Sequence, residues 1–290
     1  MASKPKIAVS SCLVGHKVRH NGDAAEFRPL TTKWNEHLEL VPICPEVGIG
    51  MSVPRTKIRL IKEDDKIKLI NPKNGDKVLE IGCGWGGFAE YLGKKYDVKL
   101  DCITISKKQY EYAKERIYRC GLNEKVNIQI KDYRDLKDKY NSIASIEMIE
   151  AVGQNYLESY FKTLKGNLAN NGTAAIQAIT IDDSLFDRYK NKQDFIQKYI
   201  FPGGFLPSKN SINKYVSENG LTIKSFDSYS NHYSSTLSLW RNEFNRKWDL
   251  IKNQGFDSTF KRMWEFYLSY CEAGFKSKNI DLIQFSLQNK

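Results

Sequence analysis

The residues with the clearest chemical meaning lie in the run VLEIGCGWGG at positions 78–87. A short apolar segment ends there in a turn with glycine at positions 82, 84, 86 and 87, and a helix-like segment follows. Glycine lets a backbone turn sharply and lie close to a ligand, where a Cβ atom would clash. A strand, a glycine-rich turn and a helix in this order are typical of the nucleotide-cofactor site of a Rossmann-like sheet.

Glu80 stands directly before this turn, which contains no lysine that could bind a phosphate. A carboxylate without such a lysine indicates a cofactor with a cationic amino-acid part rather than a pyrophosphate. S-adenosylmethionine fits that description. Glycine turns are also common as purely structural elements, so the prediction depends on the segments around it.

From residue 76 onward, segments typical of strands and helices alternate, which predicts a parallel sheet with helices on both faces. We expect strands at 77–81, 98–105, 126–130, 143–147, 173–181, 221–226 and 281–287. We expect helices at 88–95, 107–120, 156–168, 211–219, 237–251 and 259–276. Residues 183–208 have no clear periodicity and are expected to form a lid or a substrate-binding insertion. Ligands of such a sheet bind at the carboxyl ends of its strands.

The composition is that of a globular protein, with 41% hydrophobic and 27% charged residues and a net charge of +11. No apolar run approaches the ~18 residues of a membrane span, and the start lacks a secretory hydrophobic region. The six scattered cysteines form no CxxC motif, so we expect a reduced, cytoplasmic protein without a bound metal. The basic charge favours nucleic acid or an anionic membrane face as partner. A base-flipping motif and a basic cluster interleaved with aromatics are both missing, which argues against nucleic acid.

Residues from about 64 to 290 resemble the cyclopropane-fatty-acyl-phospholipid synthase family, which includes the mycolic acid cyclopropane synthases. The resemblance rests on ordered motifs: VLEIGCGWGGFAEY, ITISKKQYEYA, DYRDL, SIEMIEAVG, YIFPGGFLPS, HYSSTLSLW and FKRMWEFYLSYCEAGFKSKNIDLIQF. It implies a class I S-adenosylmethionine-dependent methyltransferase fold, with a mostly parallel seven-stranded sheet. It also implies methylene transfer to an alkene of a phospholipid acyl chain through a carbocation, with bicarbonate as the base.

The resemblance assigns functional residues to two groups. Those expected to bind the cofactor are Glu80, Gly82, Cys83, Gly84, Trp85, Gly86, Thr104, Ser106, Gln109, Asp132, Tyr133 and Glu147. Those expected at the catalytic anion site are Glu150, Tyr233, Gln177, Ile179 through its backbone amide and, as a minor candidate, His232. Ser106 could equally be a helix N-cap, and Asp132 could be an ordinary turn residue.

The chain departs from the family pattern in two places. Well-known members carry a histidine where this chain has Gln177, which can donate a hydrogen bond to an anion but cannot titrate. The helical N-terminal segment that supplies a cysteine to the anion site in the family is also replaced by other sequence. Either departure leaves room for a C-methyltransferase that acts on another lipid or on a soluble small molecule, or for a fusion that binds cofactor without turnover.

Residues 6–60 instead resemble a second family, the domain of unknown function 523, whose members include a thiouracil desulfidase. The residues that fall on its motifs are Cys12, Arg19, Cys44, Pro45, Glu46, Pro54 and Arg55. Desulfidase members hold an iron–sulfur cluster with three cysteines, of which only Cys12 and Cys44 are present here. We therefore expect an inactive fragment at 1–62, fused to a methyltransferase domain at 63–290. As an alternative, Cys12 or Cys44 replaces the missing cysteine of the anion site.

The sequence thus predicts a lipid-modifying enzyme that works at the inner membrane surface. Its substrate is expected to be an unsaturated phospholipid, and its cofactor S-adenosylmethionine. The aromatic residues of 237–251 and 259–276 are expected mainly as core, with some lining an apolar channel for a lipid tail. The oligomeric state and the acyl-chain specificity are not encoded in any pattern found here.

Overall fold

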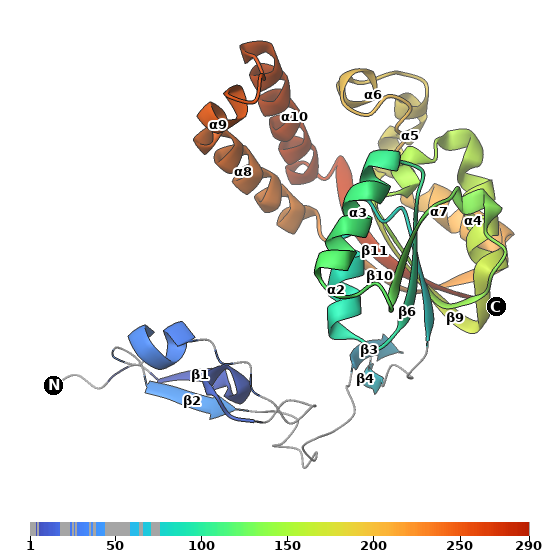
Figure 1. The fold of residues 1–290 in the computed structure, drawn as a ribbon. Helices are drawn as coiled ribbons and strands as arrows, with labels where there is room; N and C mark the ends of the chain where they lie inside the picture. The colour runs from blue at the N-terminus through green and yellow to red at the C-terminus, as the bar shows by residue number, and fades with distance from the viewer. Residues whose placement is uncertain are drawn as a thin grey trace. The chain divides into compact units, whose positions relative to one another are not determined.

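The structure, a computed structural model, describes residues 4, 6–17, 24, 26, 28–34, 36, 39–43, 59–63, 66–70 and 76–289. The chain divides into two compact units, Met1–Pro72 and Lys73–Lys290 (Figure 1). The sequence predicts a domain boundary at residues 62–63, where the resemblance changes from one family to the other. The exact position of this boundary stays a prediction.

The N-terminal unit contains two small strand pairs. Strands β1 (Lys6–Ser10) and β2 (Glu39–Ile43) run parallel, and β3 (Arg59–Glu63) forms an antiparallel pair with β4 (Lys66–Ile70). A 3-10 turn (Ser11–Val14) follows β1, and a π-helical turn (Leu30–Trp34) precedes β2. Cys12 lies in the 3-10 turn, whereas Cys44 and Arg19 lie outside the described residues, as do the motif residues 45, 46, 54 and 55.

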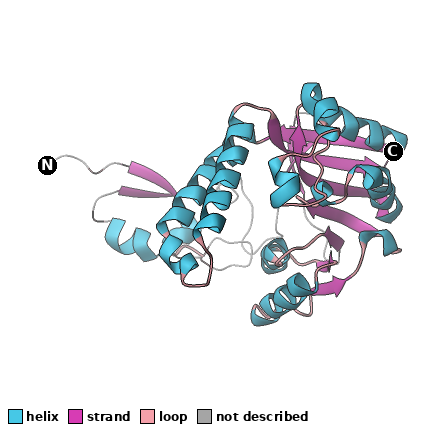
Figure 2. Cartoon of the chain, turned by 90° about the horizontal axis from the view of Figure 1, so that it is seen from above, coloured by secondary structure: helices cyan, strands magenta, loops and turns pink. Residues whose placement is uncertain are grey.

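The C-terminal unit is built around one seven-stranded sheet in the order β10-β11-β9-β8-β5-β6-β7 (Figure 2). Strand β11 runs antiparallel to both of its neighbours, and all other pairs are parallel. The strands are β5 (Lys77–Ile81), β6 (Lys99–Thr104), β7 (Val126–Ile130), β8 (Tyr140–Ile146), β9 (Leu168–Ile181), β10 (Leu221–Ser228) and β11 (Ile280–Asn289). The predicted α/β fold with a mostly parallel sheet is therefore confirmed.

Helices connect these strands and cover both faces of the sheet. They are α2 (Gly87–Lys95), α3 (Lys107–Arg119), α4 (Leu157–Asn167), α5 (Asp183–Lys190), α6 (Phe195–Tyr199), α7 (Lys209–Glu218), α8 (Ser230–Arg246), α9 (Trp248–Lys252) and α10 (Ser258–Lys276). Three short 3-10 turns lie at Tyr133–Asp135, Ile149–Ala151 and Gln154–Tyr156. Among the helices of the described residues, none combines the length and apolar character that crossing a bilayer requires.

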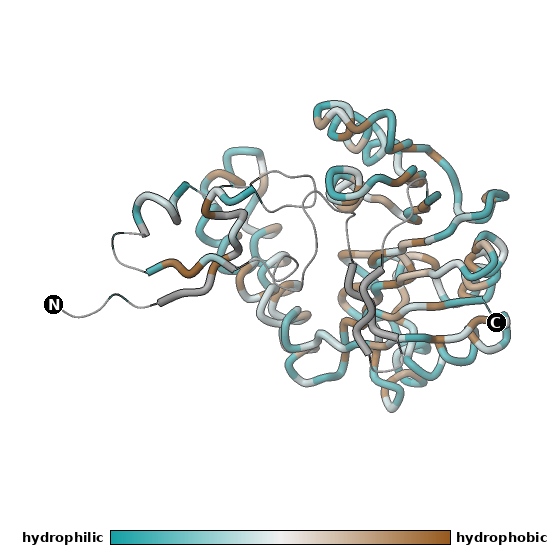
Figure 3. The backbone as a smooth tube through the Cα atoms, turned by 90° about the horizontal axis from the view of Figure 1, so that it is seen from below, coloured by the Kyte–Doolittle hydropathy of each residue, from teal (hydrophilic) through white to brown (hydrophobic). Residues whose placement is uncertain are grey.

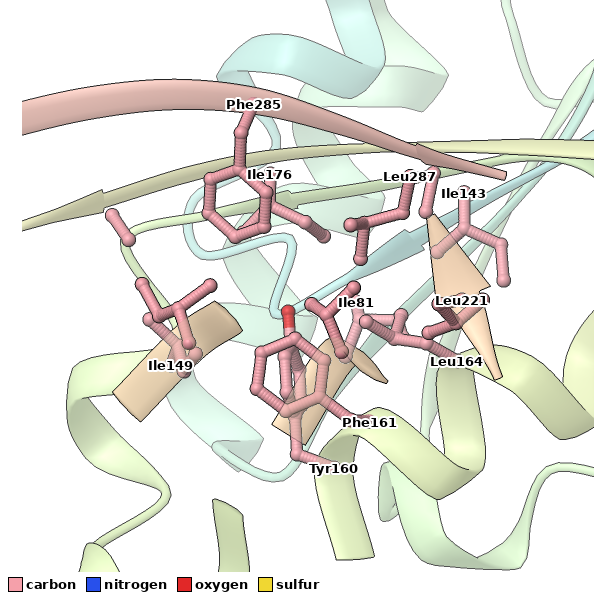
Figure 4. Close-up of a cluster of buried hydrophobic side chains, with 14 of the residues drawn as sticks. Ile81, Ile143, Ile149, Tyr160, Phe161, Leu164, Ile176, Leu221, Phe285 and Leu287 are labelled. Carbon is pink, nitrogen blue, oxygen red and sulfur yellow. The ribbon is translucent and has the colours of Figure 1, made fainter. Parts of the chain in front are cut away.

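Successive side chains of a strand point to opposite faces of the sheet, so the buried residues form one cluster on each face. Leu79 and Ile81 of β5 face α4 and α7, in a cluster that includes Tyr160 and Phe161 of α4 (Figure 4). Val78 of the same strand faces the opposite side, where the cluster is completed by buried residues of α2 and α3. Figure 3 shows the hydrophobic stretches gathered along the strands of the sheet. This packing fixes the strand ends from which the candidate residues project.

Three expectations about the elements are wrong in detail. Residues 183–208 are not without regular structure, because they contain α5 and α6, each begun by an aspartate that caps the helix: Asp182 and Asp194. The first aromatic helix begins at Ser230, not near residue 237, and β9 begins at Leu168. Polar residues near Ser230 and just after Leu168 interrupt the apolar pattern, so the sequence does not indicate these earlier starting points.

Candidate active site

The glycine turn between β5 and α2 is closely packed on one side and open on the other. Gly82 has a φ of 79°, and a Cβ added to it would lie 2.7 Å from Cγ of Met148. Gly86 has a φ of 77°, and its Cβ would lie 3.1 Å from Cβ of Ala113 in α3. A Cβ on Gly84 would meet no atom within 4 Å. The turn therefore presents its backbone to an open space, as a cofactor cradle requires.

Glu80 is buried directly below this turn, at 3% exposure. Its Oε2 accepts a hydrogen bond from the Cys102 thiol at 3.4 Å. Burial raises the pKa of Glu80 to about 7, against a smaller opposite effect of the Cys102 hydrogen bond. Burial, together with the charge of Glu80, also raises the pKa of Cys83 to about 12, so that this cysteine stays a neutral thiol.

The segment after β6 orders the next group of candidates. The Thr104 hydroxyl donates to Oε1 of Gln109 at 2.8 Å and accepts a hydrogen bond from the Ser106 backbone N–H at 3.2 Å. Ser106 is the N-cap of α3, since its side chain accepts from the Gln109 backbone N–H at 3.3 Å. The structural role expected for Ser106 is therefore present. The three residues line up at the carboxyl end of β6, beside the glycine turn.

The remaining cofactor candidates have varied surroundings. Trp85 is half exposed, and its ring packs edge-on against Tyr112 at 5.4 Å. Asp132 is a turn residue that caps the 3-10 turn and pairs with the Arg134 guanidinium at 2.7 Å, whose hydrogen bonds lower its pKa. Tyr133 packs against the buried Tyr160 at 5.9 Å. Both lie in the loop after β7, as expected from the motif.

The structure brings three candidates from distant parts of the chain into one hydrogen-bonded group. Glu147 follows β8, Gln177 lies in β9, and Tyr233 lies in α8. Gln177 Nε2 donates to Oε1 of Glu147 at 2.8 Å, and the Tyr233 hydroxyl donates to Oε2 of Glu147 at 3.1 Å. We call these three residues the carboxylate cluster. Glu147, expected at the cofactor, thus lies with the residues expected at the anion site.

Glu150 lies next to the carboxylate cluster. It belongs to the 3-10 turn Ile149–Ala151, which comes shortly after Glu147 in the sequence. Its Oε1 accepts the Ile179 backbone N–H at 2.5 Å, and its Oε2 is buried without a hydrogen-bond partner. Burial, with a smaller contribution from the charge of Glu147, raises the pKa of Glu150 to about 7. The Glu150 carbonyl accepts the Phe205 N–H at 2.8 Å, which ties the FPGGF loop to this turn.

His232 lies apart from this group. It is exposed, its ring is 6.1 Å from that of Tyr229, and it lines a cavity of about 400 Å³ with Asp182 and Lys209. The minor catalytic role considered for it therefore has no geometric support. Within the described residues, no cluster of three or more histidine, cysteine or acidic side chains could bind a metal ion.

Three residues near the carboxylate cluster were missed at the level of sequence. Gln284 of β11 donates to Oε1 of Gln177 at 2.7 Å. Tyr267 and Cys271 of α10 lie near Tyr233, and burial raises the pKa of each to about 12. The spacing of aromatics in α10 could have indicated Tyr267. Gln284 lies opposite Gln177 because β11 pairs with β9 in this register, which no pattern in the sequence indicates.

Helices α8 and α10 form a hairpin beyond the carboxyl edge of the sheet, next to α5 and α6 (Figure 1). Arg241 Nη2 pairs with Oε2 of Glu272 at 2.9 Å and links the two helices. Of the nine aromatic residues in the two predicted aromatic segments, only Phe275 is fully buried. Five of the others are half-buried, and Phe244, Trp264 and Tyr267 pack against the buried cluster that contains Phe275. The expectation that most of them contribute to core packing is therefore met only in part.

Comparison with known proteins places this chain in a family. The sequence model of the Mycolic acid cyclopropane synthetase family matches residues 55–285, and that of the 2-thiouracil desulfurase family matches residues 7–86. A crystal structure of a mycolic acid cyclopropane synthase complexed with SAH and CTAB superposes with a TM-score of 0.67 and 26% identity. The match covers 74% of this chain and 78% of that one.

Curated relatives point the same way. The tuberculostearic acid methyltransferase of Mycobacterium tuberculosis is 39% identical over 78% of this chain. The cyclopropane-fatty-acyl-phospholipid synthase of Escherichia coli K12 is 36% identical over 80%. The aligned regions cover 53% and 57% of these two relatives, so the chain spans about half of their length. The chain belongs to the mycolic acid cyclopropane synthetase family.

Proposed function

We propose that this chain transfers a methyl or methylene group from S-adenosylmethionine to the double bond of an unsaturated phospholipid acyl chain. The observation that carries the proposal is the carboxylate cluster beside the glycine turn. Methyl transfer to an alkene leaves a carbocation, which a fixed carboxylate and aromatic faces stabilise and which a base must then discharge. Glu147 and Tyr233 supply both kinds of group at one strand edge.

The residues of the glycine turn fit S-adenosylmethionine. Glu80, Gly82 and Gly84 would hold its amino-acid part, since a carboxyl group lies here below a turn that has open space at Gly84. Thr104 and Gln109 would border it at the end of the neighbouring strand. When bound, the cofactor supplies an electrophilic methyl group on a sulfonium. The protein has to hold that group in line with an alkene carbon and keep water away.

A lipid acceptor is supported by the surface around this edge. The exposed apolar side chains of α6, the FPGGF loop, α8, α9, the loop after α9 and α10 include Tyr199, Phe201, Leu239, Trp240, Leu250, Phe256, Phe266 and Tyr270. An exposed apolar surface of this kind, in a chain of net charge +11, is suited to an anionic lipid surface. We propose peripheral binding at the membrane face, where an acyl chain can reach the site.

The test is mass spectrometry of unsaturated phospholipid vesicles incubated with the whole protein and S-adenosylmethionine. A gain of one CH2 with loss of the double bond, established by ozonolysis, would support cyclopropane formation. A gain of CH2 with the alkene retained would mean C-methylation, in line with the name of the Mycobacterium tuberculosis relative. No gain on any lipid, with cofactor binding intact, would contradict the proposal and favour a soluble acceptor.

For residues 1–62 we propose a desulfurase-like fragment without desulfurase activity. Its support is the presence of only Cys12 and Cys44 of the three cysteines expected for a cluster. Iron analysis of protein purified without oxygen, together with an assay on thiouracil, tests this directly. Stoichiometric iron with release of sulfide would overturn it.

A further inference from the structure

Three donors that the family resemblance assigns to a bound bicarbonate are already bonded to a carboxylate of this chain. Tyr233 and Gln177 donate to Glu147 at 3.1 and 2.8 Å, and the Ile179 N–H donates to Glu150. A second anion placed there would lose these hydrogen bonds and would lie beside two acidic side chains. Bicarbonate would therefore have to compete with Glu147 and Glu150 for these donors.

The backbone at Glu147 indicates that this carboxylate is placed there at a cost. Its φ is 49°, in the left-handed region that disfavours a residue with a Cβ. The strained residue is held by its own N–H, which donates to the Gln177 carbonyl at 2.9 Å. Strain of this kind persists where the surrounding structure imposes it, and it concentrates at functional sites.

Glu147 also lies near the cofactor turn and is accessible. It is followed by Met148, whose side chain packs against the Gly82 position of the cofactor turn. Unlike Glu150, Glu147 is exposed in the structure, so that a substrate can reach its oxygens. Glu147 thus follows the strand that pairs with β5, which carries the glycine turn.

Neutral neighbours orient this carboxylate. Gln284 Nε2 donates to the side-chain oxygen Oε1 of Gln177 at 2.7 Å. This hydrogen bond orients the Gln177 side-chain amide so that its NH2 group faces Glu147. Burial raises the pKa of Tyr233, Tyr267 and Cys271, so that these groups stay protonated around neutral pH. Within this group Glu147 is the accessible acceptor for a proton.

We propose that Glu147 is the base of the reaction, in place of bicarbonate, with Gln177 and Gln284 as positioning residues. The proposal rests on the proposed function. The alkene electron pair forms a bond to the methyl carbon, and the pair of the breaking C–S bond stays on sulfur, which leaves a cation on the second alkene carbon. A Glu147 oxygen then takes a proton from the new methyl group, and the C–H pair closes the ring. The proton later passes from the carboxyl group to water.

The first experiment measures product formation on unsaturated vesicles in CO2-free buffer and in buffer with added bicarbonate. We expect the unaltered protein to work equally well in both. Glu147→Gln should lose about 100-fold or more in turnover, since it keeps the shape but cannot take the proton. The control Glu158→Gln, an exposed glutamate of α4, should match the unaltered protein. Dependence of the unaltered protein on bicarbonate, or full turnover of Glu147→Gln, would overturn the proposal.

The second experiment does not depend on turnover. Line broadening of [13C]bicarbonate is measured with protein that is saturated with S-adenosylhomocysteine. We expect no broadening by the unaltered protein, and broadening by Glu147→Gly, which removes the carboxylate and relieves the positive φ. Thermal melts and cofactor titration establish that each variant folds. If the unaltered protein modifies no lipid, the proposed function fails and this inference fails with it. If the protein modifies lipid and also binds bicarbonate specifically, only this inference fails.

Discussion

The hydroxyl of Tyr233 donates a hydrogen bond to the carboxylate of Glu147 at 3.1 Å, across 86 residues of sequence. The Tyr233 ring is held edge-on against the buried Phe275 at 4.9 Å, so the hydroxyl has little freedom to leave this position. The contact joins the helical hairpin to the strand edge that carries the glycine turn. A change in the hairpin therefore acts directly on the carboxylate that borders the cofactor site.

Tyr233→Phe should reduce turnover by about 10- to 100-fold while it lowers the free energy of unfolding by about 1 kcal/mol or less. The ring and its packing on Phe275 stay, and one hydrogen bond to Glu147 is lost. Steady-state kinetics on vesicles and urea denaturation measure the two effects. Tyr118→Phe, at an exposed residue of α3, serves as control. Unchanged turnover in Tyr233→Phe would remove this hydroxyl from the site.

Gly82→Ala should weaken cofactor binding and lower the melting temperature more than Gly121→Ala does. Both glycines have a positive φ, 79° and 65°, so both substitutions carry a backbone cost of about 1–2 kcal/mol. Only at Gly82 does the new Cβ also collide with Met148, at 2.7 Å, whereas Gly121 has open space. Calorimetric titration with S-adenosylhomocysteine and thermal melts compare the pair. Equal effects of the two substitutions would mean that the contact with Met148 relaxes without cost.

Glu150→Gln should stabilise the protein at alkaline pH and leave it unchanged near pH 4. Because burial raises the pKa of Glu150 to about 7, from 4.5, the folded state binds more protons than the unfolded state between these values. Stability from this group therefore falls as pH rises from 4.5 to 7 and is level above that. The variant avoids this loss, which amounts to at most about 3 kcal/mol at pH 8. The glutamine oxygen can still accept the Ile179 N–H.

Denaturation of the unaltered protein and Glu150→Gln is compared at pH 4, 6 and 8. Only the difference between the two proteins reports on Glu150, because the raised pKa of Glu80 gives a slope of the same sign in both. A difference that does not change with pH would show that Glu150 titrates normally in the folded state.

Phe195→Ala should loosen the α5–α6 segment and raise the KM for vesicles by roughly 2- to 10-fold, with little change in cofactor affinity. Phe195 packs edge-on against Phe266 of α10 at 4.6 Å, and this contact joins the segment to the hairpin. Limited proteolysis should cut the variant faster within 183–204. Tyr118→Ala removes an exposed aromatic ring elsewhere and should change neither quantity.

Several elements were predicted from sequence because their determinants are local. The strand at Lys77–Ile81 and the turn after it have an apolar run and clustered glycines, and both are where the sequence placed them. The N-cap of α3 at Ser106 was likewise visible as a residue type before a helical segment. The short α6 was missed, since its capping box at Asp194 and Gln197 stabilises only one helical turn.

The sequence by itself determined the order of strands and helices, the glycine turn and the motifs that identify the family, because these depend on residue type and spacing along the chain. Only the tertiary structure decided which side chains meet. Glu147 was assigned to the cofactor from its place after a strand, and Gln284 had no assigned role. The pairing of β9 with β11 places Gln284 against the Gln177 side chain. Glu147 in turn accepts hydrogen bonds from Gln177 and from Tyr233 of α8. Hydrogen-bond partners are chosen by distance in the folded chain, and that distance is set by packing of the whole sheet.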